Sequence, residues 1–252
     1  MLLATVQVAS VDAGGRLRLP KHVKEIWLDV GTNSAGFLRT SNQSIFILGF
    51  EPLQDKWAKM LSAASTPLNV RSNETGFAKN RVPLGKSASN SVVLPFAISS
   101  NLGHATFYVA ALDGCSSLKR PQKVDDPRYS QHVKTVCTEQ AEARQVPTVT
   151  LEYVLGSLLP GGMPVTRLKV DAQGHDLAVV KSGGALVKGI KQITLESYPD
   201  DCPAFYEDQP LCSKIVAGMA ELGFSSLSPP CGKDKGCSTQ NLIFQHVLRK
   251  AR

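Results

Sequence analysis

The stretch Ile-Trp-Leu-Asp-Val-Gly-Thr-Asn-Ser-Ala-Gly, residues 26–36, decides the fold class of this chain. Residues 26–30 form a short apolar, partly β-branched run that predicts a strand, and a glycine follows directly. A glycine at this point lets the backbone approach a ligand closely, and a helix N-terminus after it favours polar or anionic groups. The pattern is not G-x-G-x-x-G, which disfavours a dinucleotide site, and the chain has no P-loop motif.

Strands alternate with helical stretches along the rest of the chain, which predicts an α/β sheet with crossover helices. We expect further strands at residues 44–50, 92–98, 103–111, 167–170, 193–197, 224–227 and 241–247. We expect helices at residues 53–64, 150–159, 176–182 and 212–222. Residues 65–91 and 112–147 are polar and irregular and are expected to be excursion loops. A single domain over residues 1–252, with a core of about 24–250, accounts for the length.

The composition excludes several classes of protein. Hydrophobic residues make up 42% and charged residues 19%, which excludes intrinsic disorder as the main state. No apolar run approaches the ~18–20 residues that span a bilayer, and the N-terminus lacks a basic region typical of a signal peptide. The net charge is +7, but Lys and Arg are scattered along the chain. We therefore expect neither a membrane span nor dedicated nucleic-acid binding.

The six cysteines favour disulfides. The last four lie among Asp, Pro, Gly and Lys, as loop residues do, and an even number in loops favours an oxidising compartment. The simplest pairing joins sequence neighbours, namely Cys115 with Cys137, Cys202 with Cys212 and Cys231 with Cys237. No C-x-x-C spacing is present, so we expect no metal site at the cysteines. Localisation in the secretory lumen or outside the cell is favoured, with the cytoplasm as the alternative.

Polar residues follow five of the expected strands, where ligands bind in open α/β sheets. They are Asp29, Glu51, Ser99, Asp171 and Glu196. Glu51 ends the second strand within Gly-Phe-Glu-Pro, where a carboxylate can accept hydrogen bonds from both ribose hydroxyls of a nucleotide-type ligand. The sequence therefore predicts a nucleotide-type site at this edge.

Four ordered motifs resemble the FkbM family of S-adenosylmethionine-dependent methyltransferases. The family shows D-V-G-A-N-x-G, F-E-P, T-L-D and L-K-x-D-x-E-G-x-E in this order. The corresponding stretches here are residues 29–36, 50–52, 150–152 and 168–176, and residues 97–103 resemble the family's third-strand segment. The resemblance spans about residues 26–197.

The resemblance implies a class I methyltransferase, Rossmann-like, with a seven-stranded mostly parallel sheet and flanking helices. It implies S-adenosylmethionine as cofactor, bound by Asp29, Gly31, Asn33, Glu51, Pro52, Ile98, Ser99 and Asp171. The sequence departs from the family pattern at three positions. Ala35 replaces the last glycine of the first motif, Glu152 replaces an aspartate, and Gln173 replaces a glutamate. The stretch between Gly36 and Ser44 is also short for a full helix.

Methyl transfer to a hydroxyl needs alignment of the acceptor and often a base that removes its proton. Asp171, His175 and Glu196 are the candidate bases, and His175 has the most suitable ordinary pKa, about 6.5. A metal-assisted route through Asp171 and Glu196 is the less favoured alternative.

We expect O-methylation of a sugar, glycan or small-molecule acceptor. RNA or protein methylation and a non-catalytic binding module remain the alternatives. The sequence predicts neither the acceptor's identity nor the oligomeric state.

Overall fold

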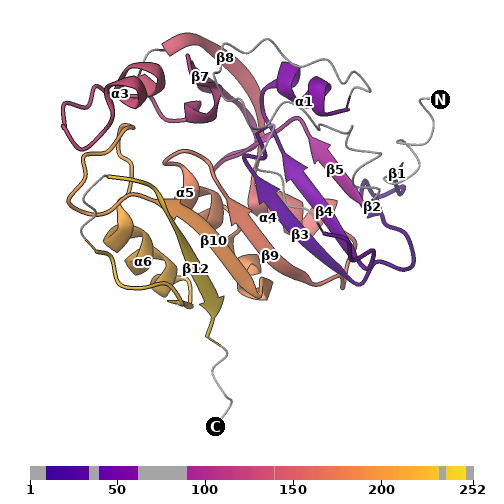
Figure 1. The fold of residues 1–252 in the computed structure, drawn as a ribbon. Helices are drawn as coiled ribbons and strands as arrows, with labels where there is room; N and C mark the ends of the chain where they lie inside the picture. The colour runs from indigo at the N-terminus through magenta and orange to yellow at the C-terminus, as the bar shows by residue number, and fades with distance from the viewer. Residues whose placement is uncertain (1–9, 34–39, 62–89, 139, 233–236, 248–252) are drawn as a thin grey trace.

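A mixed seven-stranded sheet forms the centre of the molecule (Figure 1). The computed structural model describes residues 10–33, 40–61, 90–138, 140–232 and 237–247. The strands of the large sheet are β3 (Glu25–Val30), β4 (Ile45–Phe50), β5 (Ser91–Leu94), β9 (Val165–Val170), β10 (Gln192–Ser197), β11 (Phe224–Ser226) and β12 (Gln240–His246). Their order is β11-β12-β10-β9-β3-β4-β5.

The pairing of these strands is parallel except around β12. Strand β3 lies between β4 and β9 and pairs with both in parallel, and the β4–β5 and β9–β10 pairings are parallel as well. Strand β12 runs antiparallel to β10 and to β11. Every residue of β4 is buried, as expected for an inner parallel strand with both faces covered. The carboxyl ends of β3, β4 and β9 therefore lie side by side at one end of the strands.

Helices pack against one face of the sheet and bury its main apolar core. They include α5 (Asp176–Lys181) and α6 (Cys212–Glu221). Val180 of α5 and Met219 of α6 belong to one buried cluster with Leu168 and Leu195 of the sheet. Burying each such side chain contributes about 1.5–3 kcal/mol, so this layer supplies much of the stability.

The opposite face is covered over β4 and β5 by helix α1 (Gln54–Leu61). Trp57 and Met60 of α1 pack on Ile47 and Val93, and the Trp57 indole Nε1 donates to the Val93 carbonyl at 2.8 Å. The helix expected at residues 53–64 is thus observed where the structure describes it. The loop expected at residues 65–91 lies almost wholly outside the described residues.

A second sheet of three strands lies at the edge of the large sheet, with helix α3 (Gln131–Thr138) nearby (Figure 1). Its strands are β6 (Ala97–Ile98), β7 (Gly103–Ala110) and β8 (Gln140–Val149), in the order β6-β8-β7. The expected single strand at 92–98 is divided between β5 and β6, with Pro95 in the break. The excursion loop expected at 112–147 was wrong in part, because it contains α3 and most of β8.

The remaining elements are short. They are β1 (Ser10–Val11), β2 (Leu17–Arg18), η1 (Asp113–Cys115), α4 (Leu151–Tyr153), η2 (Val154–Leu158) and η3 (Gly184–Gly189). The helix expected at 150–159 corresponds to α4 and η2 together. Among the described residues, no helix is long and apolar enough to cross a membrane.

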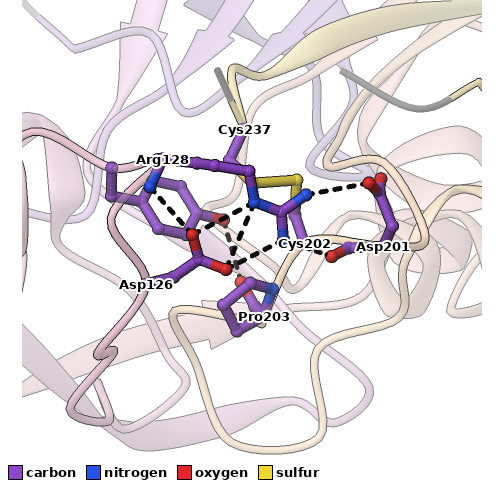
Figure 2. Close-up of polar contacts among 7 residues, drawn as sticks. Asp126, Arg128, Asp201, Cys202, Pro203 and Cys237 are labelled. Atoms are coloured by element: carbon purple, nitrogen blue, oxygen red, sulfur yellow. Dashed lines mark hydrogen bonds and ion pairs between the residues drawn. A yellow bond between two sulfur atoms is a disulfide. The ribbon is translucent and has the colours of Figure 1, made fainter. Parts of the chain in front are cut away.

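A separate buried cluster forms what we call the Cys-rich cap, residues 112–138 and 198–206 together with Cys237. Its aromatic centre is Tyr129, which packs edge-on against Phe205 at 4.4 Å between ring centroids. Figure 2 shows the Arg128 guanidinium between Asp126 and Asp201, with nitrogen–oxygen distances of 2.8 Å to each. The Arg128–Asp201 ion pair joins the two segments of the cap.

Three disulfides occur, and two of them differ from the simplest pairing. Cys115 is bonded to Cys137, as expected. Cys202 is bonded to Cys237 and Cys212 to Cys231, so the expected neighbour pairs 202–212 and 231–237 were wrong. The reason is tertiary: Cys212 begins α6, and the return of the chain after β11 brings Cys231 to it. The pairing is nested rather than sequential.

Candidate functional site

A pocket opens at the carboxyl ends of β3, β4 and β9. Its lining also includes residues of β6, β7 and η1, so the small sheet and the cap contribute to it. Seven residues singled out from the sequence line this pocket: Gly31, Asn33, Glu51, Pro52, Ile98, Asp171 and His175. Residues far apart in sequence thus meet at the predicted edge of the sheet.

Gly31 allows two strand ends to approach each other behind the pocket. Its φ is +76°, and a Cβ built there would lie 1.9 Å from the Asp171 carbonyl oxygen. Only glycine fits, because any side chain would collide with backbone. Asn33 follows, also with a positive φ of 42°. The turn after β3 is therefore shaped by contact with the end of β9. The Ala35 and Gly36 positions of this motif lie outside the described residues.

Glu51 places a buried carboxylate at the end of β4. The residue is 4% exposed, and its two oxygens accept hydrogen bonds from the backbone N–H groups of Asn33 at 3.1 Å and Leu53 at 3.0 Å. Burial raises the pKa of Glu51, although the charge of Lys56 and the two backbone donors oppose this. Each oxygen retains a lone pair for a ligand, so the carboxylate can accept two hydroxyls.

Lys56 is a pocket residue that sequence reasoning missed. Its ammonium group donates to Asn33 Oδ1 at 3.0 Å and pairs with Asp113 Oδ2 at 3.2 Å, and its side chain is 7% exposed. Lys56 thereby ties α1 to η1 across the pocket and balances the nearby Glu51. The available signal was its position one turn after Glu51-Pro52, on the helix that follows β4.

One side of the pocket is apolar. Ile98, Phe96, Phe107 and Leu118 contribute to this wall, which comes from β6, β7 and the connections around them. Of these, only Ile98 was singled out from the sequence. An apolar slot beside a carboxylate suits a ligand with a flat aromatic part and a hydroxylated part.

Gln173 joins two acidic residues at the other side of the pocket. Its Nε2 donates to Asp171 Oδ1 at 2.7 Å and to Glu196 Oε2 at 2.9 Å. Burial, followed by the charge of Asp171, raises the pKa of Glu196 to about 7. The amide stands where the family pattern has a glutamate, so a neutral donor here replaces a third carboxylate.

His175 faces the pocket just before α5. Neither ring nitrogen has a hydrogen-bond partner among the residues that the structure describes. Burial and the charge of Lys119 lower the pKa of His175 to about 4, so the imidazole is neutral near pH 7. The neighbouring Asp176 is fully buried and accepts from the Gly174 N–H at 3.1 Å, which orders this turn.

Three residues singled out from the sequence do not line the pocket. Asp29 is fully buried in β3, with Lys169 Nζ at 3.7 Å from its carboxylate. Ser99 donates its backbone N–H to the Val149 carbonyl at 2.9 Å. Glu196 reaches the pocket only through Gln173. Within the described parts of the chain, no group of three or more His, Cys, Asp or Glu residues could hold a metal ion.

Comparison with known protein families matches residues 29–226 to the methyltransferase FkbM domain. The chain belongs to the FkbM methyltransferase family. A search of curated proteins found no match. Membership in the FkbM family implies a methyltransferase fold, a transferase activity and a methyl donor, usually S-adenosylmethionine. It also implies an acceptor, either a small molecule or a macromolecule. The match begins at Asp29, so the motif after β3 that decided the fold class lies within the family domain.

Proposed function

We propose that this protein is an S-adenosylmethionine-dependent O-methyltransferase that acts on a hydroxyl of a sugar, glycan or small molecule. It would form a single class I methyltransferase domain over residues 1–252, with β12 as the antiparallel strand of an otherwise mostly parallel seven-stranded sheet. The observation that carries the proposal is the buried Glu51 carboxylate at the end of β4, beside Gly31 and Asn33 and facing an apolar slot.

The chemistry of this pocket fits the cofactor. Glu51 would accept the ribose hydroxyls, while Pro52 and Ile98 would flank the adenine. Gly31 and Asn33 would meet the amino-acid part, and Asp171 would lie near the positively charged end. Asp29 and Ser99 would support this arrangement from behind, since neither lines the pocket. The cofactor supplies an activated methyl group on a sulfonium, so positioning is the main task of the protein.

His175 is the best candidate for the base. It lines the pocket, it is neutral near pH 7, and its ring nitrogens are unpartnered among the described residues. The imidazole would remove the proton of the acceptor hydroxyl as the methyl group arrives. Glu196 would act indirectly, through Gln173 and Asp171.

Calorimetric titration with S-adenosylmethionine tests the cofactor site. We expect Glu51→Gln to weaken binding by about 10-fold or more, because one acceptor oxygen becomes an amide donor and the remaining oxygen loses its charge. Glu221→Gln is the matched control, since that carboxylate is 73% exposed on α6. Absence of binding to the folded wild type would refute the function, and unchanged binding by Glu51→Gln would refute the site. A screen of glycan and small-molecule hydroxyls with labelled cofactor would then identify the acceptor.

A further inference from the structure

Tyr206 is a buried phenol that contacts the acidic side of the pocket from outside it. The residue is 2% exposed, and its hydroxyl lies 3.0 Å from Gln173 Oε1 and 2.7 Å from the Cys115 carbonyl oxygen. Its ring also packs on the next residue, because a Cβ built at Gly174 would lie 3.0 Å from Tyr206 Cδ2. Tyr206 therefore restrains both the side chain of Gln173 and the turn that carries it.

The turn at Gln173 needs such restraint. Gln173 has a φ of 49°, a left-handed conformation that non-glycine residues rarely adopt. Ser117 Oγ holds its carbonyl oxygen with a hydrogen bond of 2.8 Å. Tyr206 and Ser117 both belong to the Cys-rich cap, so the cap fixes Gln173 from two sides.

The cap itself is tied together by covalent and ionic links. Cys115, whose carbonyl oxygen lies 2.7 Å from the Tyr206 hydroxyl, is bonded to Cys137, and Cys202, four residues before Tyr206, is bonded to Cys237. Beside this second disulfide, Arg128 joins Asp201 to Asp126 (Figure 2). The position of the Tyr206 hydroxyl is therefore set by the cap rather than by the sheet.

We propose, on the basis of the function proposed above, that Tyr206 is a positioning residue of the methyl-transfer site. Through Gln173 it holds the Asp171 and Glu196 carboxylates in the arrangement that the cofactor meets. Without this anchor, the Gln173 amide is free to leave the space between the carboxylates, and two acidic groups then face each other unbridged. Cofactor affinity and its dependence on pH change together.

Several other groups face this acidic pair, and their charges are common to all the variants compared below. They are Asp29 and Lys169 from the sheet, Asp176 from the start of α5, and Tyr198 after β10. Thr239 also donates to Glu196. A difference between the wild type and a Tyr206 variant therefore reports on the Gln173 amide between Asp171 and Glu196. It does not report on these surrounding charges, which are the same in both proteins.

The experiment compares Tyr206→Phe with Tyr129→Phe. Both tyrosines belong to the cap, and both hydroxyls lie within hydrogen-bond distance of a backbone carbonyl, that of Cys115 for Tyr206 and that of Pro203 for Tyr129. Only Tyr206 reaches Gln173. We expect Tyr206→Phe to weaken S-adenosylmethionine binding by about 2- to 10-fold and to shift the pH midpoint of binding. Tyr129→Phe should leave both unchanged.

Two outcomes would overturn the proposal separately from the function. If the wild type binds S-adenosylmethionine but both variants bind it with the wild-type affinity and pH profile, Tyr206 has no positioning role. If both variants lose affinity equally, the effect is general loosening of the cap. If the folded wild type does not bind the cofactor at all, the function itself fails, and the role of Tyr206 with it.

A second feature is independent of the methyl-transfer site. The triplet Asn42-Gln43-Ser44 matches N-x-[ST], the acceptor pattern for N-linked glycans. Asn42 is exposed, and its Oδ1 accepts from the backbone N–H of Ser44 at 3.0 Å and from the Ser44 hydroxyl at 2.8 Å. In the described part of the chain, Asn42 Nδ2 makes no hydrogen bond. The amide nitrogen is thus available at the surface.

The position of Asn42 is compatible with a bulky attachment. It precedes β4, whereas the pocket lies after β4, and six strand residues place the two about 20 Å apart. The three disulfides, with no free cysteine in the chain, suit an oxidising compartment, where such transfer occurs. A glycan here would leave the pocket open.

We infer that Asn42 is a site of N-linked glycosylation. The co-reactant is an oligosaccharide joined to a lipid diphosphate. Asn42 Nδ2 forms a bond to C1 of the first sugar, the bond between C1 and the diphosphate oxygen breaks, the lipid diphosphate leaves, and the amide loses one proton. A second triplet, Asn73-Glu74-Thr75, lies outside the described residues.

Secretion of the full chain from a eukaryotic host tests this site, with Asn73→Gln in every version so that Asn42 is examined alone. We expect the peptide containing Asn42 to carry glycan, and enzymatic removal of that glycan to convert Asn42 to aspartate. Ser44→Ala should abolish the modification, whereas Ser44→Thr, which keeps the hydroxyl, should retain it. An unmodified Asn42 in the secreted, disulfide-bonded protein would overturn the inference, as would equal glycosylation of Ser44→Ala.

Discussion

Replacement of Gly31 by alanine tests how closely β3 and β9 approach behind the pocket. The new Cβ would start 1.9 Å from the Asp171 carbonyl oxygen, whereas real Cβ contacts essentially never fall below 3.0 Å. The two backbones must therefore separate by about 1.1 Å or more, in an interior packed too densely to absorb it. The left-handed conformation costs alanine a further ~1–2 kcal/mol, and overpacking typically costs about 1–3 kcal/mol.

We expect Gly31→Ala to lower the free energy of unfolding by about 2–5 kcal/mol, measured by urea titration. Gly162→Ala is the matched control, because Gly162 has the same φ of +76° but a Cβ added there would meet nothing within 4 Å. That variant should lose only about 1–2 kcal/mol, from backbone strain alone. Gly31→Ala should also lose binding of S-adenosylmethionine, while Gly162→Ala keeps it.

The comparison has a clear contrary result. If the two variants are destabilised equally, the clash with Asp171 contributes nothing to the loss in the free energy of unfolding. The close approach of β3 and β9 is then not the reason that glycine is required at position 31. If Gly31→Ala is destabilised but binds the cofactor normally, the turn after β3 does not shape the pocket.

Three further outcomes are expected. His175→Gln should reduce kcat by about 10²–10⁴-fold with little change in cofactor affinity, as loss of a general base does. An unchanged kcat would exclude His175 as the general base. The raised pKa of Glu196 adds stability that is present below pH 4.5 and lost as the pH rises to about 7, so the wild type should lose about 1–3 kcal/mol relative to Glu196→Gln over this interval in urea titrations. A flat difference would contradict the buried environment of Glu196. Replacing Cys202 and Cys237 by serine should lower stability by about 2–5 kcal/mol in the same assay, whereas an unchanged midpoint would mean that this bridge is dispensable.

The main strands and the pocket edge could be predicted because their signals are local. Apolar runs followed at once by Gly31 or Glu51 indicate both where a strand ends and where a ligand binds. Strand β8 was missed because only Val146, Thr148 and Val149 are buried along its described side chains, and Pro147 interrupts them. An alternation of apolar and polar residues over so few positions does not predict a strand.

The roles of Gln173 and Lys56 could not be predicted, since both depend on contacts between distant segments. Gln173 meets Tyr206 from 33 positions away, and Lys56 meets Asp113 from 57 positions away. Neither contact produces a periodic pattern of residue types that can be recognised in the sequence. The disulfide pairing has the same origin, because the path of the chain around α6, and not the spacing of the cysteines, determines which sulfurs meet.

The nested arrangement of the last two disulfides has a consequence for how damage to this region would be observed. The inner bridge joins Cys212 to Cys231, and the outer one joins Cys202 to Cys237 around it. A protease that nicks the chain once between Cys212 and Cys231 leaves the two pieces held by both bridges. Such a protein migrates as one intact molecule on a gel until a reductant is added, so a cut beside α6 stays hidden under non-reducing conditions.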